Sequence, residues 1–278
     1  MRKFSIVAAI ALGLATTACD IQAGNGKFNV DFASGKATET WSKTYKLADK
    51  GRFELINVNG RITAEATDGT DLVVEGKKTA KARSDEAAKE LLPKMEIREE
   101  VGDSTIRVES RPPRLTGFNS QEIEWTIKVP KGIVVDLRTT NGGVRLNNLT
   151  NEIHAKSTNG GVKGVQITAS VVEATTVNGG VDIELASALG AKDSIELEAV
   201  NGGVSLAFPS DSKATIEARC VNGGVKVENL EIEREQQSSE FERRRRLNGT
   251  LNGGGGKVRM STTNGGVELL GRTPKKTT

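Results

Sequence analysis

Few side chains in this 278-residue sequence have the type and spacing that catalysis requires. The chain contains one histidine, His154, and two cysteines, Cys19 and Cys220, which lie far apart. A single imidazole excludes a multi-histidine metal site, and two distant thiols exclude a zinc cluster or a disulfide framework. No serine and acid at a recognisable spacing accompany His154. The sequence therefore predicts no catalytic residue, no cofactor and no metal-binding residue.

Charged side chains do recur at regular spacing, in two rows that alternate with apolar residues. Carboxylates held near each other are the groups that cleave glycosidic bonds. The acidic row contains Asp136, Glu173, Glu196 and Glu217, and the basic row contains Arg138, Lys156 and Arg219. Mixed charges are equally expected on any solvated surface. A carbohydrate-active β-helix enzyme, a glycan lyase or hydrolase acting on envelope polysaccharide, is therefore the alternative function.

The start of the chain has the features of an export signal. Two cations, Arg2 and Lys3, precede an apolar run over 4–14, which is too short to span a bilayer and is typical of a signal peptide. Small residues follow, immediately before Cys19. This arrangement resembles a bacterial lipobox, which implies a signal peptide over 1–18 and a fatty acid such as palmitate on Cys19. An ordinary signal peptide cut nearby would instead leave a free thiol.

One segment of the sequence is strongly basic. It consists of Arg243, Arg244, Arg245 and Arg246, called the arginine run below. These charges could contact anionic lipid headgroups or an acidic glycan; they could equally lie in a solvated loop. The polar segment around them, 236–247, is predicted to be a loop or a strand extension. The net charge of the whole chain, +3, is too small to imply a nucleic acid partner.

An internal repeat must position these side chains. The tetrapeptide Asn-Gly-Gly-Val occurs six times, which is a strong signal of a repetitive fold. Its asparagines are Asn141, Asn159, Asn178, Asn201, Asn222 and Asn264. The last spacing, 42 residues, equals two units of 21. A degenerate copy lies upstream, at Asn59-Gly60-Arg61-Ile62.

The residues that flank the tetrapeptide alternate between apolar and polar types. Counted from each asparagine, positions −6, −4 and −2 are apolar or small, and position +3 is always valine. This period of two predicts strands with one buried face. The valines expected in the core are Val144, Val162, Val181, Val204, Val225 and Val267. Cys220, at position −2, is also expected inside, whereas Val177 and Val200, just before their asparagines, are expected on the surface.

Two architectures fit this pattern of strand, Asn-Gly-Gly and strand. Each segment could be a hairpin turn between antiparallel strands, or one corner of a coil in a β-solenoid. No second turn recurs where a hairpin fold would need one, which favours the solenoid. Stacked coils also explain the recurring asparagine, because aligned side-chain amides can form a hydrogen-bonded ladder. The six asparagines are therefore predicted to be structural turn residues.

The sequence before the repeats is less regular. Alternating stretches over 41–130 surround one short helix, predicted over 85–92 because Ser84 is a suitable N-cap and Pro93 a terminator. Residues 19–40, rich in small and polar types, are predicted to be a flexible tether. The expected parts are thus a signal peptide, 1–18, a tether, 19–40, an N-terminal β region, 41–130, and the repeat region, 131–278.

The repeats resemble a bacterial β-strand-repeat family of unknown function that carries the label "putative adhesin". The matching segments are Asn57-Val58-Asn59-Gly60-Arg61-Ile62, Val129-Pro130-Lys131-Gly132, the Asn-Gly-Gly-Val copies and the ending over 247–267. The resemblance covers roughly residues 50–272. It implies an extracytoplasmic, right-handed parallel β-solenoid with coils of about 20 residues. It implies no activity and supplies no catalytic residue.

The sequence therefore predicts an all-β, non-catalytic protein of the bacterial cell envelope. Lipid on Cys19 would anchor the protein to the inner or outer membrane, facing the periplasm or the exterior. The expected role is that of a scaffold, an adhesin-like module or an accessory of an envelope-stress system. The expected partner is an envelope protein or a glycan, contacted through the arginine run, Val177 and Val200.

Overall fold

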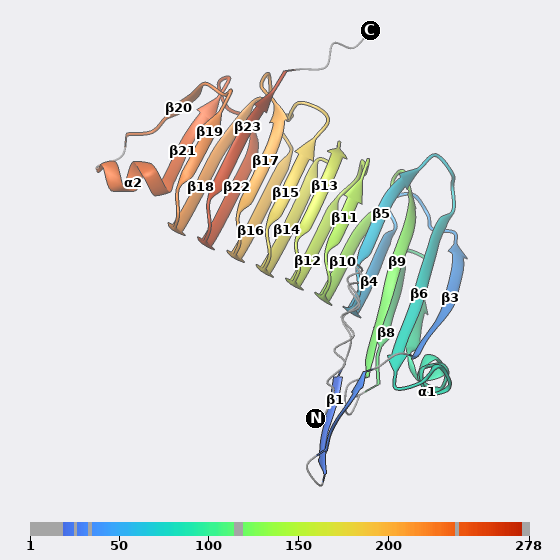
Figure 1. The fold of residues 1–278 in the computed structure, drawn as a ribbon. Coiled ribbons are helices and arrows are strands. Elements are labelled where there is room, and N and C mark those ends of the chain that lie inside the picture. The colour runs from blue at the N-terminus through green and yellow to red at the C-terminus, as the bar shows by residue number, and fades with distance from the viewer. Residues whose placement is uncertain (1–18, 25–26, 33–34, 114–118, 237–238, 274–278) are drawn as a thin grey trace.

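A computed structural model of the chain describes residues 19–24, 27–32, 35–113, 119–236 and 239–273. Strands make up 65% and helices 6% of the structure, so the fold is predominantly β, as the sequence predicts. Two large mixed sheets, of 11 and 10 strands, account for nearly all of it (Figure 1). The predicted signal peptide, 1–18, lies outside the described residues.

The 11-stranded sheet contains the strand that precedes each asparagine of the repeat. In spatial order it consists of β20 (Ile232–Arg234), β21 (Arg246–Leu251), β18 (Ala214–Asn222), β22 (Gly256–Asn264), β16 (Ser194–Asn201), β14 (Val171–Asn178), β12 (Ile153–Asn159), β10 (Val134–Asn141), β4 (Arg52–Asn59), β8 (Thr105–Arg111) and β7 (Glu96–Val101).

The 10-stranded sheet contains the strand that follows each Asn-Gly-Gly. Its spatial order is β19 (Val225–Glu228), β23 (Val267–Arg272), β17 (Val204–Pro209), β15 (Val181–Leu185), β13 (Val162–Ile167), β11 (Val144–Asn147), β5 (Ile62–Thr67), β9 (Ser120–Pro130), β6 (Leu72–Ala82) and β3 (Gly35–Tyr45).

Each copy of the repeat contributes one strand to each sheet. We call the two strands that flank one Asn-Gly-Gly segment, or its Asn59 counterpart, a rung. Neighbouring rungs pair in parallel and in register, so that Asn141 lies opposite Asn159 and Val144 opposite Val162. Because the two strands of a rung lie in different sheets, Asn-Gly-Gly is not a hairpin turn within one sheet. The hairpin alternative is therefore wrong.

The alternating pattern sorts side chains as the sequence predicts. Residues at positions −6, −4 and −2 are buried in all six copies. Five of the six valines at position +3 are also buried, and Val225, in the outermost rung, is partly buried. The core therefore runs between the two sheets along the whole stack.

The order of the last two rungs differs from their order in the sequence. Strand β22 lies between β16 and β18, so Asn264 is opposite both Asn201 and Asn222. The spacing of 42 residues between Asn222 and Asn264 is therefore not explained by an additional rung between those two copies. The chain passes over one rung position, builds the outer rung with β18 and β19, and then returns. Strand β21 pairs antiparallel with β18 and leads back to the open position beside β16.

The N-terminal part closes the opposite end of the stack. Strands β8 and β9 add one more parallel layer beside β4 and β5, and β9, β6 and β3 continue antiparallel. Trp41 and Trp125 pack edge to face there, with ring centroids 5.6 Å apart. Helix α1 (Asp85–Leu91) has its N-cap at Ser84, as predicted, and a 3-10 turn, η1 (Leu92–Lys94), replaces its expected last residue.

Strands also occur where a tether was predicted. Strands β1 (Cys19–Gly24) and β2 (Lys27–Phe32) form an antiparallel pair, and β3 begins at Gly35 within the same predicted segment. The end of that segment is therefore part of the 10-stranded sheet. None of the helices in the described ranges is long and apolar enough to cross a membrane.

The segment around the arginine run contains a helix that the sequence does not predict, followed from Arg246 by strand β21, in agreement with a strand extension over part of the segment. Helix α2 (Glu240–Arg245) begins at the N-cap Ser239, whose hydroxyl accepts a hydrogen bond from the N–H of Glu242 at 3.2 Å. Acids occupy its first turn and arginines its last, an arrangement that the helix dipole stabilises. An ion pair of 2.7 Å between Arg244 and Glu240 supports it. The N-cap hydrogen bond and the ion pair therefore stabilise a helix in a segment whose polar composition predicts a loop.

Candidate functional site

The asparagines of the repeat form a continuous ladder along one corner of the stack. Six hydrogen bonds of 2.7–2.9 Å join Asn59, Asn141, Asn159, Asn178, Asn201, Asn264 and Asn222 in that order, each donated by Nδ2 of one asparagine to Oδ1 of the asparagine before it. Each of the five inner side chains both donates and accepts, which no carboxylate at the same position can do at neutral pH. The ladder fixes the spacing of the rungs at this corner.

Small hydroxyl residues at position −2 hold the same corner from inside. Thr139, Ser157, Thr176 and Thr262 each donate to the carbonyl of the first glycine of the preceding rung, for example Thr176 to Gly160 at 2.7 Å. A buried carbonyl without a donor destabilises a fold. This explains why threonine and serine recur at a core position.

These hydroxyls should make measurable contributions to stability. Thr176→Val keeps the shape of the side chain but removes the donor to Gly160, so we expect a loss of about 1–2 kcal/mol in the free energy of unfolding. Ala199→Ser would add a donor toward Gly179 and should gain about 0.5–1 kcal/mol. Chemical denaturation measures both changes. Thr176→Ser, which keeps the hydroxyl, is the control, and equal losses in both Thr176 variants would contradict the role of the hydroxyl.

The two glycines of each copy have different structural roles. The first, such as Gly202, has φ +158°, and a Cβ there would overlap the carbonyl oxygen of Gly179. The second, such as Gly203, has no left-handed φ, and its Cβ would lie 3.5 Å from the carbonyl oxygen of Gly266, an ordinary contact. The degenerate rung carries Arg61 at this second position, in register with Gly143. The backbone therefore accommodates a side chain in the degenerate rung and at Gly203, whereas a Cβ at Gly143, Gly161 or Gly180 would lie 3.0–3.2 Å from a carbonyl oxygen of the next rung.

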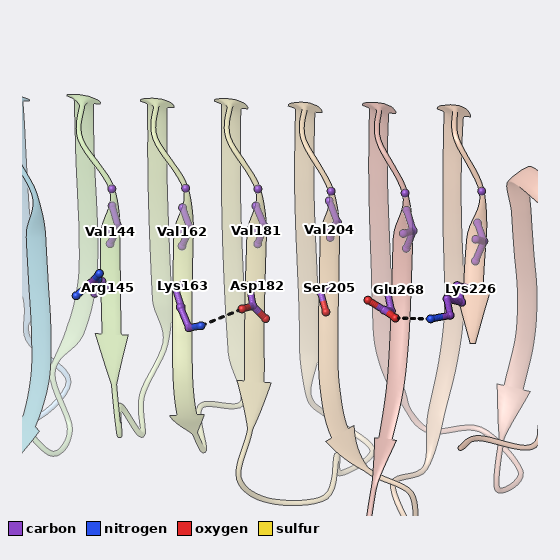
Figure 2. A pocket seen from close by; sticks show the side chains of 18 of the residues that line it. Val144, Arg145, Val162, Lys163, Val181, Asp182, Val204, Ser205, Lys226 and Glu268 are labelled. Atoms are coloured by element: carbon purple, nitrogen blue, oxygen red, sulfur yellow. Dashed lines mark hydrogen bonds and ion pairs between the residues drawn. The ribbon is translucent and has the colours of Figure 1, made fainter. Parts of the chain in front are cut away.

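The second glycines floor a long groove across the rungs, called the glycine groove below. It encloses about 1080 Å³ and is floored by Gly143, Gly161, Gly180, Gly203, Gly266 and Gly224. Arg61 lines the groove at the rung where the glycine is replaced. Figure 2 shows the residues at position +4 as a second row below the labelled valines. In spatial order this row contains Arg145, Lys163, Asp182, Ser205, Glu268 and Lys226.

The charges along the glycine groove are unevenly distributed. Arg61, Arg145 and Lys163 occupy three consecutive rungs at one end. Lys163 lies 3.3 Å from Asp182, and Lys226 lies 3.2 Å from Glu268, so the other end is balanced by ion pairs (Figure 2). One end of the groove is therefore net positive.

The only histidine of the sequence lies on the outer face of the 11-stranded sheet. His154 Nδ1 is 2.8 Å from Glu173 Oε2, and Nε2 is 2.7 Å from Glu152 Oε1. Burial lowers the pKa of His154, but the hydrogen bonds to the two carboxylates outweigh this effect and raise it above the ordinary value of 6.5. Both ring nitrogens face acceptors, so the charged imidazolium fits this site best. Sequence reasoning missed both partners, one of which comes from the next rung.

Stability should depend on pH through this cluster. Because the folded-state pKa of His154 is raised, its contribution is present below about pH 6.5 and is lost as pH rises through the folded pKa. Glu152, which His154 and Arg52 stabilise as the anion, has a lowered pKa and contributes above about pH 4.5. We expect the free energy of unfolding to fall as pH rises above about 6.5, and His154→Gln to flatten that fall. An unchanged pH profile in the variant would exclude His154 as the cause.

The other three carboxylates of the acidic row, Asp136, Glu196 and Glu217, form ion pairs with arginines. Asp136 is nearly buried beneath Arg138, which binds both its oxygens at 2.9 and 2.7 Å. Glu196 and Glu217 both face Arg259, at 3.6 and 3.2 Å. This arrangement depends on the exchanged rung order, because β22 carries Arg259 between the two acids. Among the residues the structure describes, no group of three or more His, Cys, Asp or Glu could hold a metal ion.

The residues predicted as a contact surface lie at the C-terminal half of the stack. Val200 is 42% exposed and Val177 is partly buried. Arg243, Arg244 and Arg245 end helix α2, and Arg246 begins β21. The arginine run meets the glycine groove only at its outermost rung, where a Cβ at Gly224 would lie 3.7 Å from the carbonyl oxygen of Arg244. Arg245 and Arg246 line a separate hollow of about 400 Å³, beside Val221 and Thr263.

The two cysteines lie in different parts of the fold. Cys220 is buried, 7% exposed, and unpaired, as predicted, and it lines the wall of the hollow beside α2. Burial raises the pKa of its thiol, while the positive charge of Arg245 opposes this effect. Such a thiol is a poor nucleophile. Cys19 is the first residue of β1.

Comparison with known proteins identifies no family. The chain matches no protein-family model and no curated protein. Among solved structures, it is similar to a "putative cell adhesion protein" from Clostridium sporogenes, with 13% identity, a TM-score of 0.48, and coverage of 85% of this chain and 100% of the other. It is also similar to a "putative adhesin" from Bacteroides fragilis, with 14% identity, a TM-score of 0.35, and coverage of 84% and 97%. A "putative lipid binding protein" from Parabacteroides distasonis has 7% identity, a TM-score of 0.31, and coverage of 84% and 97%.

Proposed function

We propose that this protein is a non-catalytic, adhesin-like binding module of the bacterial cell envelope, and that the glycine groove is its main contact surface. The observation that supports this proposal is the second glycine of each Asn-Gly-Gly-Val copy. In that position the backbone has no left-handed φ, and Arg61 occupies the same position in another rung. A small residue that recurs there and keeps a groove open supports a role in binding.

The proposed architecture is a right-handed parallel β-solenoid in which each rung is one coil. We propose that 41–130 closes one end of this rod and that 131–278 forms the repeat region. Parallel, in-register pairing of the rungs supports this interpretation. A stiff rod with a groove along it suits a protein that holds an extended partner. The arginine run, Val177 and Val200 form a second proposed contact region.

The proposed membrane anchor is lipid on Cys19, after removal of residues 1–18. Metabolic labelling with a radioactive fatty acid in a bacterial host tests it, because the wild-type chain should be labelled and should sediment with membranes. Cys19→Ser should lose both properties, while Cys220→Ser should keep them. Equal labelling of wild type and Cys19→Ser would refute the anchor.

Binding to isolated cell envelopes tests the proposed role. Filling the groove with Gly203→Gln should lower the amount of protein retained by the envelopes about tenfold. Changing the arginine run to serine, or Val177 and Val200 to lysine, tests the second region in the same assay. The enzyme alternative predicts release of reducing sugar ends from envelope glycan that is lost in Glu173→Gln or Glu196→Gln. Such turnover would overturn the non-catalytic proposal.

A further inference from the structure

A regular row of backbone N–H groups belongs to the floor of the glycine groove. Except in the outermost rung, the N–H of each first glycine bonds to a neighbouring rung, as Gly142 does to the carbonyl of Asn159 at 2.9 Å. The valine N–H in these rungs does likewise, as Val144 does to the carbonyl of Gly161 at 2.9 Å. Between them, the N–H of the second glycine has no hydrogen-bond acceptor in any of the six copies, within the part of the chain that the structure describes.

In four rungs, interior hydroxyls explain why these donors have no partner in the stack. The first-glycine carbonyl, which a regular parallel ladder would offer to a neighbouring rung, accepts instead from the core residue at position −2 in four rungs. The second glycines are mostly exposed and all line the groove. The result is one unused donor per rung, repeating at the strand spacing of about 4.8 Å.

The spacing of these donors discriminates between extended ligands. Carbonyl groups on one edge of an extended peptide recur every two residues, about 6.6 Å apart, and so do not match a repeat of about 4.8 Å. A linear polysaccharide presents ring and hydroxyl oxygens on every sugar, and one pyranose ring is about as long as one rung spacing. Its oxygens can therefore meet one donor in each rung.

The charges of the groove specify the kind of polysaccharide. Arg61 and Arg145 are exposed, lie in adjacent rungs and have no ion-pair partner among the described residues. They form a positive end that suits carboxylates. None of the described residues that line the groove is aromatic, so affinity must come from hydrogen bonds and charge and should fall as salt screens the charges.

We propose that the glycine groove binds a linear acidic polysaccharide that runs across the rungs, with about one sugar per rung and its carboxylates toward Arg61 and Arg145. This inference rests on the proposed function and names its ligand class. The N–H groups of the second glycines donate to the sugar oxygens. Because glycine has no side chain, the polysaccharide can lie close to the protein backbone. The ligand is held without bond cleavage.

Calorimetric titration of the full chain tests this proposal. The probe is an oligomer of galacturonic acid long enough to cross the six glycine rungs, and a neutral glucose oligomer of equal length is its control. We expect the acidic oligomer to bind at least tenfold more tightly than the neutral one at low salt, and to weaken at high salt. Equal binding of the two, or no binding of either, would overturn the proposal.

Matched variants locate the site. Gly203→Gln and the double variant Arg61→Gln/Arg145→Gln should each weaken binding of the acidic oligomer about tenfold. Lys192→Gln, at an exposed lysine outside the groove, should leave it unchanged, and thermal unfolding should show that all variants are folded. Unchanged binding in both groove variants would overturn the proposed site. If envelope retention still depends on the groove while the acidic oligomer does not bind, the ligand class fails and the proposed function stands.

Discussion

Gly202→Ala should destabilise the middle of the stack severely, whereas Gly203→Ala should have little effect. A Cβ at Gly202 would overlap the carbonyl oxygen of Gly179, and the φ of +158° disfavours any side chain. Gly179 cannot retreat, because its own N–H bonds to Asn201 at 2.9 Å and Asn178 is part of the ladder. We expect Gly202→Ala to lose about 3–5 kcal/mol in the free energy of unfolding, or to fail to fold.

Gly203→Ala is the matched control for this change. Its Cβ would make an ordinary contact of 3.5 Å with the carbonyl oxygen of Gly266, so we expect a change below about 0.5 kcal/mol. Urea denaturation gives both values. Hydrogen exchange at β16 and β17 would show whether the loss in Gly202→Ala is centred on that rung. Similar midpoints for the two variants would contradict the distinct roles of the two glycines.

Removing the last two strands should unfold more of the chain than it deletes. Strands β22 and β23 lie inside the stack, between β16 and β18 and between β17 and β19. A chain that ends after Gly255 loses the fully buried Val258, Met260, Val267 and Leu269. Their burial is worth roughly 6–12 kcal/mol, which is comparable with the whole stability of a typical domain. The outer rung, β18 and β19, then has no parallel neighbour.

Limited proteolysis measures this outcome. In the truncated chain we expect rapid cleavage between residues 210 and 255, while the part that contains β4 to β17 stays resistant. A chain that ends after Thr273, which keeps both strands, is the control and should be as resistant as the full chain. Resistance of residues 210–255 in the shorter chain would mean that β18 can pair directly with β16.

The periodic features of the fold follow from periodic features of the sequence. Alternation around each Asn-Gly-Gly-Val predicts which side chains are buried, because a strand exposes alternate residues to one face. Ser84 and Pro93 predict α1 for an equally local reason. The label of the resemblance, "putative adhesin", also occurs among the similar solved structures, although their likeness is too low to argue from.

The rung order and the partners of His154 are not local properties. Position −5 of the Asn264 copy holds Arg259, whereas the same position in the Asn201 and Asn222 copies holds glutamate. In sequence order Glu196 and Glu217 would be direct neighbours and would repel each other. The exchange places Arg259 between them, at 3.6 and 3.2 Å. Arg259, a cation in a row that is mostly acidic, is the sequence signal for the exchanged rung order. The exchange itself becomes visible only when the rungs are compared in space.

The asparagine ladder also has a chemical consequence for the lifetime of the protein. Asparagine followed by glycine is the sequence most prone to lose its side-chain amide, since the next backbone nitrogen attacks the amide carbon to form a cyclic imide. In the inner rungs both groups are occupied, because each inner amide is bound to both neighbours and the N–H of the glycine that follows it donates to another rung. Conversion of one asparagine to aspartate would place an acceptor against an acceptor. The folded stack therefore protects the asparagines whose deamidation would break the ladder. Chains that remain unfolded should deamidate sooner than folded chains.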